Sequence, residues 1–248
     1  MRIGLFSDVH SNLAALEAVL RAYEDLDIDR YVCLGDVVGY GPEPDACCNI
    51  VRPLVEYCIM GNHDAAVAGR MDYGFYYDAA RNALDYHNSL VSEDNLRWLA
   101  SLPWSVDWND VCFSHGSPVN PENFDYVFNT MQAAALLREW GSLQHITFIG
   151  HSHLTKSFAL HPPGAMTRIE EKLPPKIRFE EGTKYIVTVG SVGQPRDNDA
   201  RACFTVYDTD AKELEFHRIH YDVASTAEKI FAADRLSADF GKRLFLGI

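Results

Sequence analysis

The sequence is poor in basic residues. Only 22 lysines and arginines stand against 35 aspartates and glutamates, which gives a net charge of −13. A protein that wraps a nucleic-acid backbone needs a basic surface, so we do not expect a nucleic-acid partner. An acidic surface suits a protein that attracts divalent cations, although many soluble proteins share it.

The six cysteines form no C-x-x-C pair, and most of them lie within apolar runs. We interpret them as small buried hydrophobic side chains in a reducing compartment, and not as zinc ligands or disulfides. The sequence also lacks an apolar stretch as long as the core of a signal peptide or a membrane span. We therefore expect a cytoplasmic protein without a membrane partner.

The composition that remains is that of a globular protein. Hydrophobic residues make up 47% of the 248 residues, which is enough for a sizeable core. No internal repeat and no linker divides the chain, so we predict a single domain over residues 1–248.

Short apolar runs are followed directly by polar or glycine-containing turns. Near-continuous apolar strands are typical of buried sheets, and a ligand site in such a sheet lies beyond the carboxyl ends of its strands. The polar segments that follow the runs are Ser7-Asp8, Gly35-Asp36, Gly61-Asn62-His63-Asp64, Ser114-His115 and Gly150-His151.

Helical patterns lie between these runs, so the first half is typical of the β-α-β-α-β order of an α/β protein. A helix is expected from Leu13, with Ser11 or Asn12 as its N-cap, and another after Thr130. Turns at Asn109-Asp110 and at 208–212 predict hairpins. Four prolines and a glycine predict a long surface excursion at 162–175. Two helices are expected at 223–234 and 237–245.

Each polar motif alone has an ordinary interpretation. Asp8-x-His10 could be a turn with a surface histidine, Asn62 could be a helix cap, and His151-Ser152-His153 could be a chance pair. The order D-x-H, G-D, G-N-H-D, H-G, G-H-x-H is hard to obtain by chance. Together the motifs indicate a metal site.

With these motifs the sequence resembles the calcineurin-like metallophosphoesterase superfamily, in particular its compact bacterial and archaeal members. The resemblance covers residues 8–153, and the segment 190–196 is also similar. It implies a four-layer α/β/β/α sandwich. It also implies two divalent metal ions, one bound by Asp8, His10, Asp36 and His153 and the other by Asp36, Asn62, His115 and His151, with Asp36 bridging.

These ligands fit the expected chemistry. Two cations about 3.5–4 Å apart need a shared carboxylate, and a hydroxide between them can attack phosphorus in line. Carboxylate, imidazole and amide ligands suit manganese, iron, nickel or zinc. The resemblance makes His63 a non-ligand that donates a proton to the leaving oxygen or stabilises the transition state. Asp64 could orient the His63 ring, or could be a charge at a helix terminus.

The sequence also departs from the pattern. The protein-phosphatase branch continues its G-D block with an Asp-Arg pair, and here Val37 and Val38 follow Asp36. This argues against protein phosphatase and symmetrical dinucleoside polyphosphatase activity. Arg196 could replace the missing phosphate contact, or could pair with Asp197 or Asp199 at the surface.

We therefore expect a hydrolase of small phosphodiesters or phosphomonoesters. A nuclease, a hydrolase of nucleotides or dinucleoside polyphosphates, and an inactive interaction scaffold are the alternatives. Aromatic residues in 65–100 could line a substrate cleft or pack in the core. They are Tyr73, Phe75, Tyr76, Tyr77, Tyr86 and Trp98.

Overall fold

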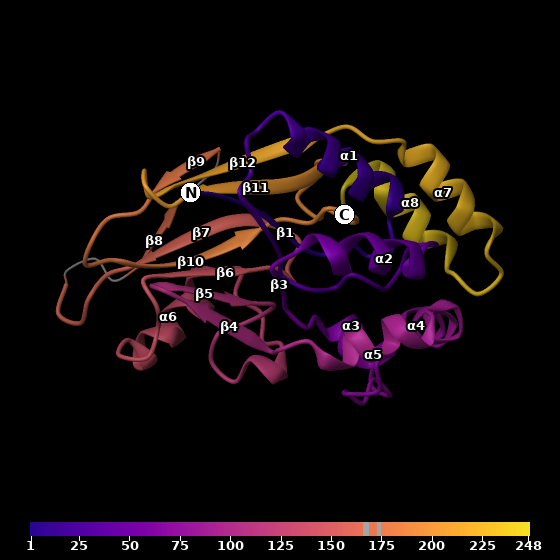
Figure 1. Cartoon of the computed structure of the whole chain (residues 1–248). Helices are drawn as coiled ribbons and strands as arrows, with labels where there is room; N and C mark the ends of the chain where they lie inside the picture. Colours follow the sequence, from indigo (N-terminus) through magenta and orange to yellow (C-terminus); the bar gives the residue numbers. More distant parts are fainter. Residues whose placement is uncertain (166–168, 173–174) are drawn as a thin grey trace.

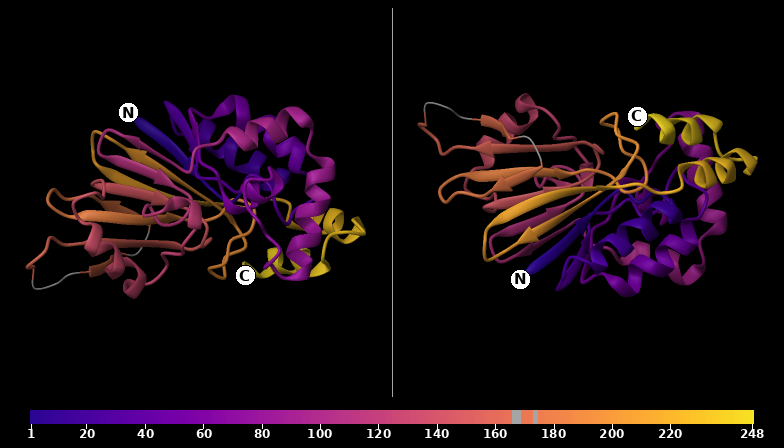
Figure 2. Two further views of the ribbon diagram at one scale, coloured as in Figure 1. Left: turned by 90° about the horizontal axis from the view of Figure 1, so that it is seen from below. Right: turned by 90° about the horizontal axis from the view of Figure 1, so that it is seen from above.

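Two mixed sheets pack face to face in the computed structural model, which describes residues 1–165, 169–172 and 175–248 (Figures 1 and 2). The first sheet has the order β3 (Tyr57–Cys58), β2 (Arg30–Cys33), β1 (Arg2–Phe6), β11 (Ala202–Asp208), β12 (Glu213–Ile219), β9 (Lys176–Arg178). The second has the order β4 (Ser105–Trp108), β5 (Val111–Ser114), β6 (Ile146–Ile149), β10 (Lys184–Val189), β7 (Thr155–Leu160), β8 (Ile169–Lys172).

The parallel strands lie on one side of the first sheet and in the middle of the second, and antiparallel strands complete both sheets. β1, β2 and β3 are parallel, as are β5, β6 and β10. A hydrophobic core fills the space between the sheets, where Leu5 and Tyr207 of the first sheet join Phe113, Phe148 and Val187 of the second. Burial on both faces explains why these strands read as near-continuous apolar runs.

Helices cover the outer faces and complete the predicted four-layer α/β/β/α sandwich (Figure 2). The helices that pack with the outer core of the first sheet are α1 (Leu13–Glu24), α2 (Pro44–Leu54), α3 (Asn62–Val67), α4 (Asp78–Leu90) and α5 (Glu93–Ser101). The short α6 (Thr130–Ala135) and a 3-10 turn (Leu136–Glu139) cover the second sheet. Another 3-10 turn spans Pro121–Asn123.

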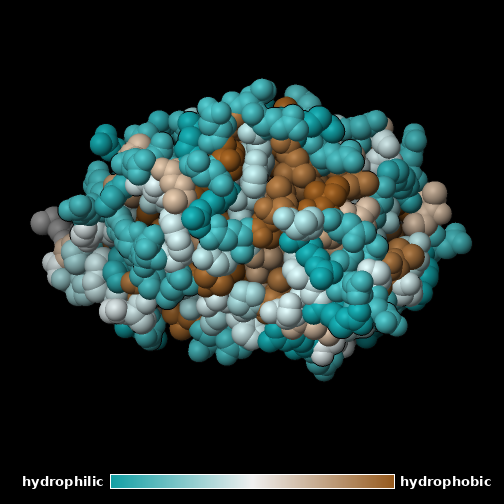
Figure 3. Space-filling view, viewed as in Figure 1, coloured by the Kyte–Doolittle hydropathy of each residue, from teal (hydrophilic) through white to brown (hydrophobic). Residues whose placement is uncertain are grey.

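The last two helices are α7 (Val223–Ala232) and α8 (Ala238–Leu246). They pack on α4 and on Tyr40 through Ile230, Phe240 and Leu244. Their bounds lie within two residues of the predicted 223–234 and 237–245. The outer surface is mostly hydrophilic in the view of Figure 3, and hydrophobic atoms gather toward its middle. No helix among the described residues is both long and apolar enough to cross a bilayer.

Several local predictions can be compared with the structure. The N-cap of α1 is Asn12, whose Oδ1 accepts from the amide of Ala15. The prediction for α6 was wrong by one residue, because Asn129 and not Thr130 caps it. Both hairpin turns are confirmed. The excursion at 162–175 contains β8, paired with β7, while 166–168 and 173–174 lie outside the described residues. All six cysteines are buried.

Candidate metal centre

Polar residues that follow the strands of both sheets converge at one edge. Asp8 follows β1, Asp36 follows β2, His115 follows β5 and His151 follows β6. Two of the groups of side chains with ligand atoms close enough to hold a metal ion are Asp8, His10 and His153, and Asp36, His115 and His151. The family resemblance assigns these two groups to different metal ions, and the structure brings the members of each group together.

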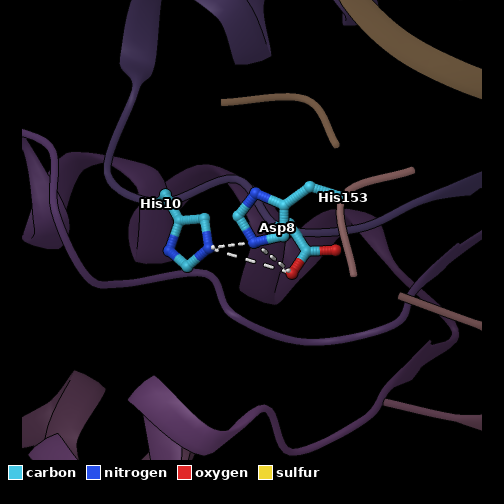
Figure 4. Close-up of side chains that lie close together, drawn as sticks. All are labelled: Asp8, His10 and His153. Carbon is cyan, nitrogen blue, oxygen red and sulfur yellow. Dashed lines mark hydrogen bonds and ion pairs between the residues drawn. The ribbon is translucent and has the colours of Figure 1, made fainter. Parts of the chain in front are cut away.

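The first group joins Asp8, His10 and His153 (Figure 4). The Nε2 atoms of the two histidines lie 3.1 Å apart, and Nε2 of His153 lies 3.3 Å from Oδ1 of Asp8. Asp36 extends this group, since its Oδ2 lies 3.6 Å from Nε2 of His10. All four side chains are buried.

The second group contains Asp36 itself, together with His115 and His151. Oδ2 of Asp36 lies 3.3 Å from Nε2 of His115, and Oδ1 of Asn62 lies 3.2 Å from the same nitrogen. The same carboxylate oxygen therefore lies beside His10 of one group and His115 of the other. This is the position that a bridging ligand requires.

The hydrogen bonds around these histidines fit a metal. Nδ1 of His10 donates to the carbonyl of Val38, and Nδ1 of His115 donates to that of Leu34. Nδ1 of His153 donates in the same way to Gln194. A donating Nδ1 leaves Nε2 as a lone pair, so the Nε2 lone pairs of His10 and His153 face each other. Oδ1 of Asp8 is buried beside them without a hydrogen-bond partner. A cation would satisfy all three atoms.

Left-handed backbone places many of these ligands. The φ angles are 54° at Asp8, 47° at His10, 53° at Asp36, 64° at His151 and 59° at His153. Residues other than glycine rarely adopt this region, and such strain is typical of functional sites. The backbone of Gly61 packs closely against the strained Asp36: a Cβ atom at Gly61 would lie 2.1 Å from Oδ1 of Asp36.

Burial and charge set the protonation of the ligands. Burial lowers the pKa of His10, His151 and His153, so they are neutral and can bind a cation. Burial alone would raise the pKa of Asp36, but the imidazoles of His115 and His63 hold it well below its usual range. Burial raises the pKa of Asp8 to about 7.

His63 lies beside both groups. Its ring centroid is 5.0 Å from that of His10 and 4.5 Å from that of Tyr40, and its Nδ1 is buried without a hydrogen-bond partner. Burial lowers its pKa to about 4. With His10 and Asp36 it forms a third group of potential ligands. Geometry alone therefore permits a ligand role as well as the non-ligand role that the resemblance implies.

Asp64 makes the contacts of a helix-terminal charge. Its Oδ1 accepts from the amide of Val38 and its Oδ2 from that of Gly61, each at 3.1 Å, at the start of α3. Both oxygens are thus used by backbone, and no hydrogen bond to His63 is found among the described residues. The contacts favour the helix-terminal interpretation over an orienting role.

Arg196 lies at the site and not in a surface ion pair. Its Nη2 donates to Oε1 of Gln194, and its guanidinium carbon lies 5.7 Å from the centre of the Tyr40 ring. The two aspartates considered as partners bind elsewhere: Asp197 pairs with Arg218 and Asp199 with Arg201. The surface-pair alternative for Arg196 is therefore wrong.

A cavity of about 400 Å³ opens over the centre. Of the six aromatic residues singled out, Phe75, Tyr76 and Tyr77 line it. Tyr73 and Trp98 pack against the core of the first sheet, and Tyr86 against α7 and α8.

Sequence reasoning missed other residues of this cavity, above all Tyr40 and Tyr126. Tyr40 stands between Gly39 and Gly41, and paired glycines signal a close approach of backbone. Nothing in the local sequence distinguishes Tyr126, whose position depends on the path of the loop after β5.

The family model for calcineurin-like phosphoesterases matches residues 1–187. The chain belongs to this family. An uncharacterized protein of Methanocaldococcus jannaschii is 35% identical over 249 residues, covering 99% of this chain and 98% of that protein. A crystal structure of a metallophosphoesterase from Sphaerobacter thermophilus is 34% identical, with a TM-score of 0.85, and covers 100% of this chain and 99% of that one.

A hypothetical protein of Pyrococcus horikoshii OT3 has the same fold, with a TM-score of 0.79, 21% identity and coverage of 100% and 98%. Membership of this family makes the protein a phosphoesterase, and members of this family typically bind divalent metals. The clustered aspartates and histidines are the candidate ligands in this chain.

Proposed function

We propose that this phosphoesterase hydrolyses phosphodiesters with two divalent metal ions, manganese, iron, nickel or zinc. One observation carries the proposal: two groups of buried candidate ligand side chains both contact a single Asp36 carboxylate, which lines a cavity. When bound, the two ions would supply a deprotonated water as nucleophile and offset the charge of the phosphoryl oxygens.

Two further side chains of the cavity would bind the substrate phosphate and protonate the leaving oxygen. Arg196, the one arginine or lysine among the described residues of its lining, would bind a phosphoryl oxygen. His63 is uncharged in the free protein, and an anionic substrate beside an imidazole raises its pKa. The protonated ring can then donate to the leaving oxygen.

A diester fits this set of charges better than a terminal phosphate. A phosphodiester carries one negative charge, and a phosphomonoester carries up to two. Val37 and Val38 follow the bridging Asp36, so that segment supplies no second arginine to bind the phosphate. A single guanidinium suits a monoanion.

The test is hydrolysis of bis-p-nitrophenyl phosphate, p-nitrophenyl phosphate and a phosphopeptide, each with manganese, iron(II), nickel, zinc and magnesium. We expect the diester to be fastest, and elemental analysis to find up to two ions per chain. Asp36→Asn should lose most metal and activity together, whereas Asp107→Asn, at an exposed position on β4, should keep both.

Four results would contradict the proposal. Full metal content in Asp36→Asn would overturn the ligand assignment, and comparable turnover of the phosphopeptide would overturn the diester preference. Absence of both metal binding and activity would favour the scaffold. Faster cleavage of polynucleotides than of small diesters would favour the nuclease.

A further inference from the structure

Three consecutive aromatic rings line the cavity, and two of them are exposed while the middle one is half-buried. Phe75, Tyr76 and Tyr77 are consecutive, between α3 and α4, and all three line the cavity. Phe75 is 77% exposed and Tyr77 is 53% exposed. Large aromatic side chains are usually buried, and neighbouring exposed ones mark a binding surface.

A further aromatic residue of the lining lies beside the candidate metal centre. Tyr126 lines the cavity and is 44% exposed. Its ring stacks on that of His151, with 3.9 Å between centroids and 17° between planes. The aromatic lining therefore begins directly at a candidate metal ligand, and a group esterified to a phosphate at the centre would reach the aromatic rings.

We propose that the natural substrate is a small nucleotide-type phosphoester whose base stacks on Phe75 and Tyr77. This rests on the proposed function, because it takes the phosphate to lie at the metal centre. Aromatic rings bind the faces of bases without reading their edges. The net charge of −13 and the single Arg196 in the described lining argue against a polynucleotide, whose further phosphates would meet an acidic surface.

The test compares a ligand that carries a base, adenosine 5′-phosphate, with one that lacks it, ribose 5-phosphate. Their dissociation constants are measured by calorimetry on the manganese-loaded protein, and released phosphate is assayed to confirm that each stays intact. We expect adenosine 5′-phosphate to bind at least about 10-fold more tightly, the range expected for stacking. Phe75→Ala and Tyr77→Ala should each reduce this ratio about threefold or more.

Phe245→Ala is the matched control, because Phe245 is 52% exposed on α8 and lies outside this cavity. It should leave the ratio unchanged. Equal affinities for the two ligands in the unmodified protein would overturn the inference, as would a ratio that survives both cavity substitutions. Hydrolysis of bis-p-nitrophenyl phosphate is measured in parallel. Activity with equal affinities refutes only the base site, whereas inactivity with every metal refutes the proposed function.

Discussion

The hydroxyl of Tyr76 holds the amide of Asn62 in one orientation. Nδ2 of Asn62 donates to this hydroxyl at 2.7 Å, which leaves Oδ1 directed to Nε2 of His115 at 3.2 Å. Only the oxygen of an amide binds a cation, so the tyrosine selects the useful face of the side chain. Groups that orient a ligand in this way influence metal affinity although they do not touch the ion.

Tyr76→Phe should therefore weaken the second metal position by roughly 10- to 100-fold, the usual effect of losing an orienting hydrogen bond. The ring stays, so folding and the cavity wall should be unaffected. Metal titration followed by calorimetry measures the two affinities. Tyr73→Phe is the control, because Tyr73 donates to Asp85 at the surface, outside the cavity. If both variants lose the same metal affinity, or if Tyr76→Phe loses none, then Tyr76 does not orient Asn62 for metal binding.

His63→Ala separates a proton donor from a ligand. As a donor, His63 should be dispensable for metal content, and its loss should lower the rate by roughly 10²- to 10⁴-fold. An aryl ester should suffer less than a nucleoside or alkyl ester, because p-nitrophenolate leaves without a proton. Rates for both ester types are compared with metal content and melting temperature. Equal losses for both esters together with reduced metal would make His63 a ligand or a packing residue.

Arg196→Ala should lower kcat/KM for phosphodiesters by roughly 10- to 100-fold, since a hydrogen bond between charged groups contributes about 1.5–3 kcal/mol. Arg196→Lys should recover part of the loss, because lysine keeps the charge but not the planar fork. Arg201→Ala is the control: that arginine pairs with Asp199 outside the cavity. A loss confined to thermal stability would show that Arg196 supports the loop and does not bind substrate.

His87 gives a prediction for pH. Its Nδ1 accepts from the amide of Gly39 and its Nε2 donates to the carbonyl of Gly41. These two hydrogen bonds tie the neutral ring to the backbone before and after Tyr40. Burial lowers its pKa from 6.5 to about 4. The neutral ring therefore stabilises the folded state fully above pH 6.5. This contribution declines as the pH falls toward 4, because the unfolded chain binds a proton that the folded chain does not.

His87→Gln should be destabilised most near pH 7, and its deficit should shrink by up to roughly 3 kcal/mol between pH 7 and pH 4. Urea unfolding of both proteins at several pH values measures the difference. His220→Gln is a suitable control, because His220 is an exposed residue after β12. If the loss of unfolding free energy in His87→Gln does not change with pH, the ring is charged in the folded state or does not stabilise the loop around Tyr40.

The sequence predicted that the polar motifs meet at one edge because they follow strand ends, whereas the four layers and the two ligand groups were implied by the family resemblance. Asp8, Asp36 and His115 directly follow buried apolar runs, and the carboxyl ends of parallel strands meet at one edge. The role of Asp64 could not be decided in this way, since an acid at the start of a helix and an acid beside a histidine have the same sequence spacing. Its two backbone contacts became visible only in the structure.

The cavity wall was predicted in part, for a physical reason. The aromatic residues of 65–100 were visible, but which of them face the cavity depends on how α4 and α5 pack. His87 and Tyr126 carried no local signal, because their partners lie 46 residues away at Gly41 and 25 residues away at His151. Arg196 could be placed only once Asp197 and Asp199 were seen to have other partners.

The pairing of β1 with β11 has a consequence for protein synthesis. β1 carries Asp8 at its end, and its residues from Arg2 to Leu5 pair with Asp208 to Thr205. During translation the first strand must therefore wait for a partner made about 200 residues later, and such distant contacts form slowly. A nascent chain that already contains all seven candidate metal ligands still has one edge of β1 unpaired. The metal centre should thus reach its final form only after the last quarter of the chain has left the ribosome.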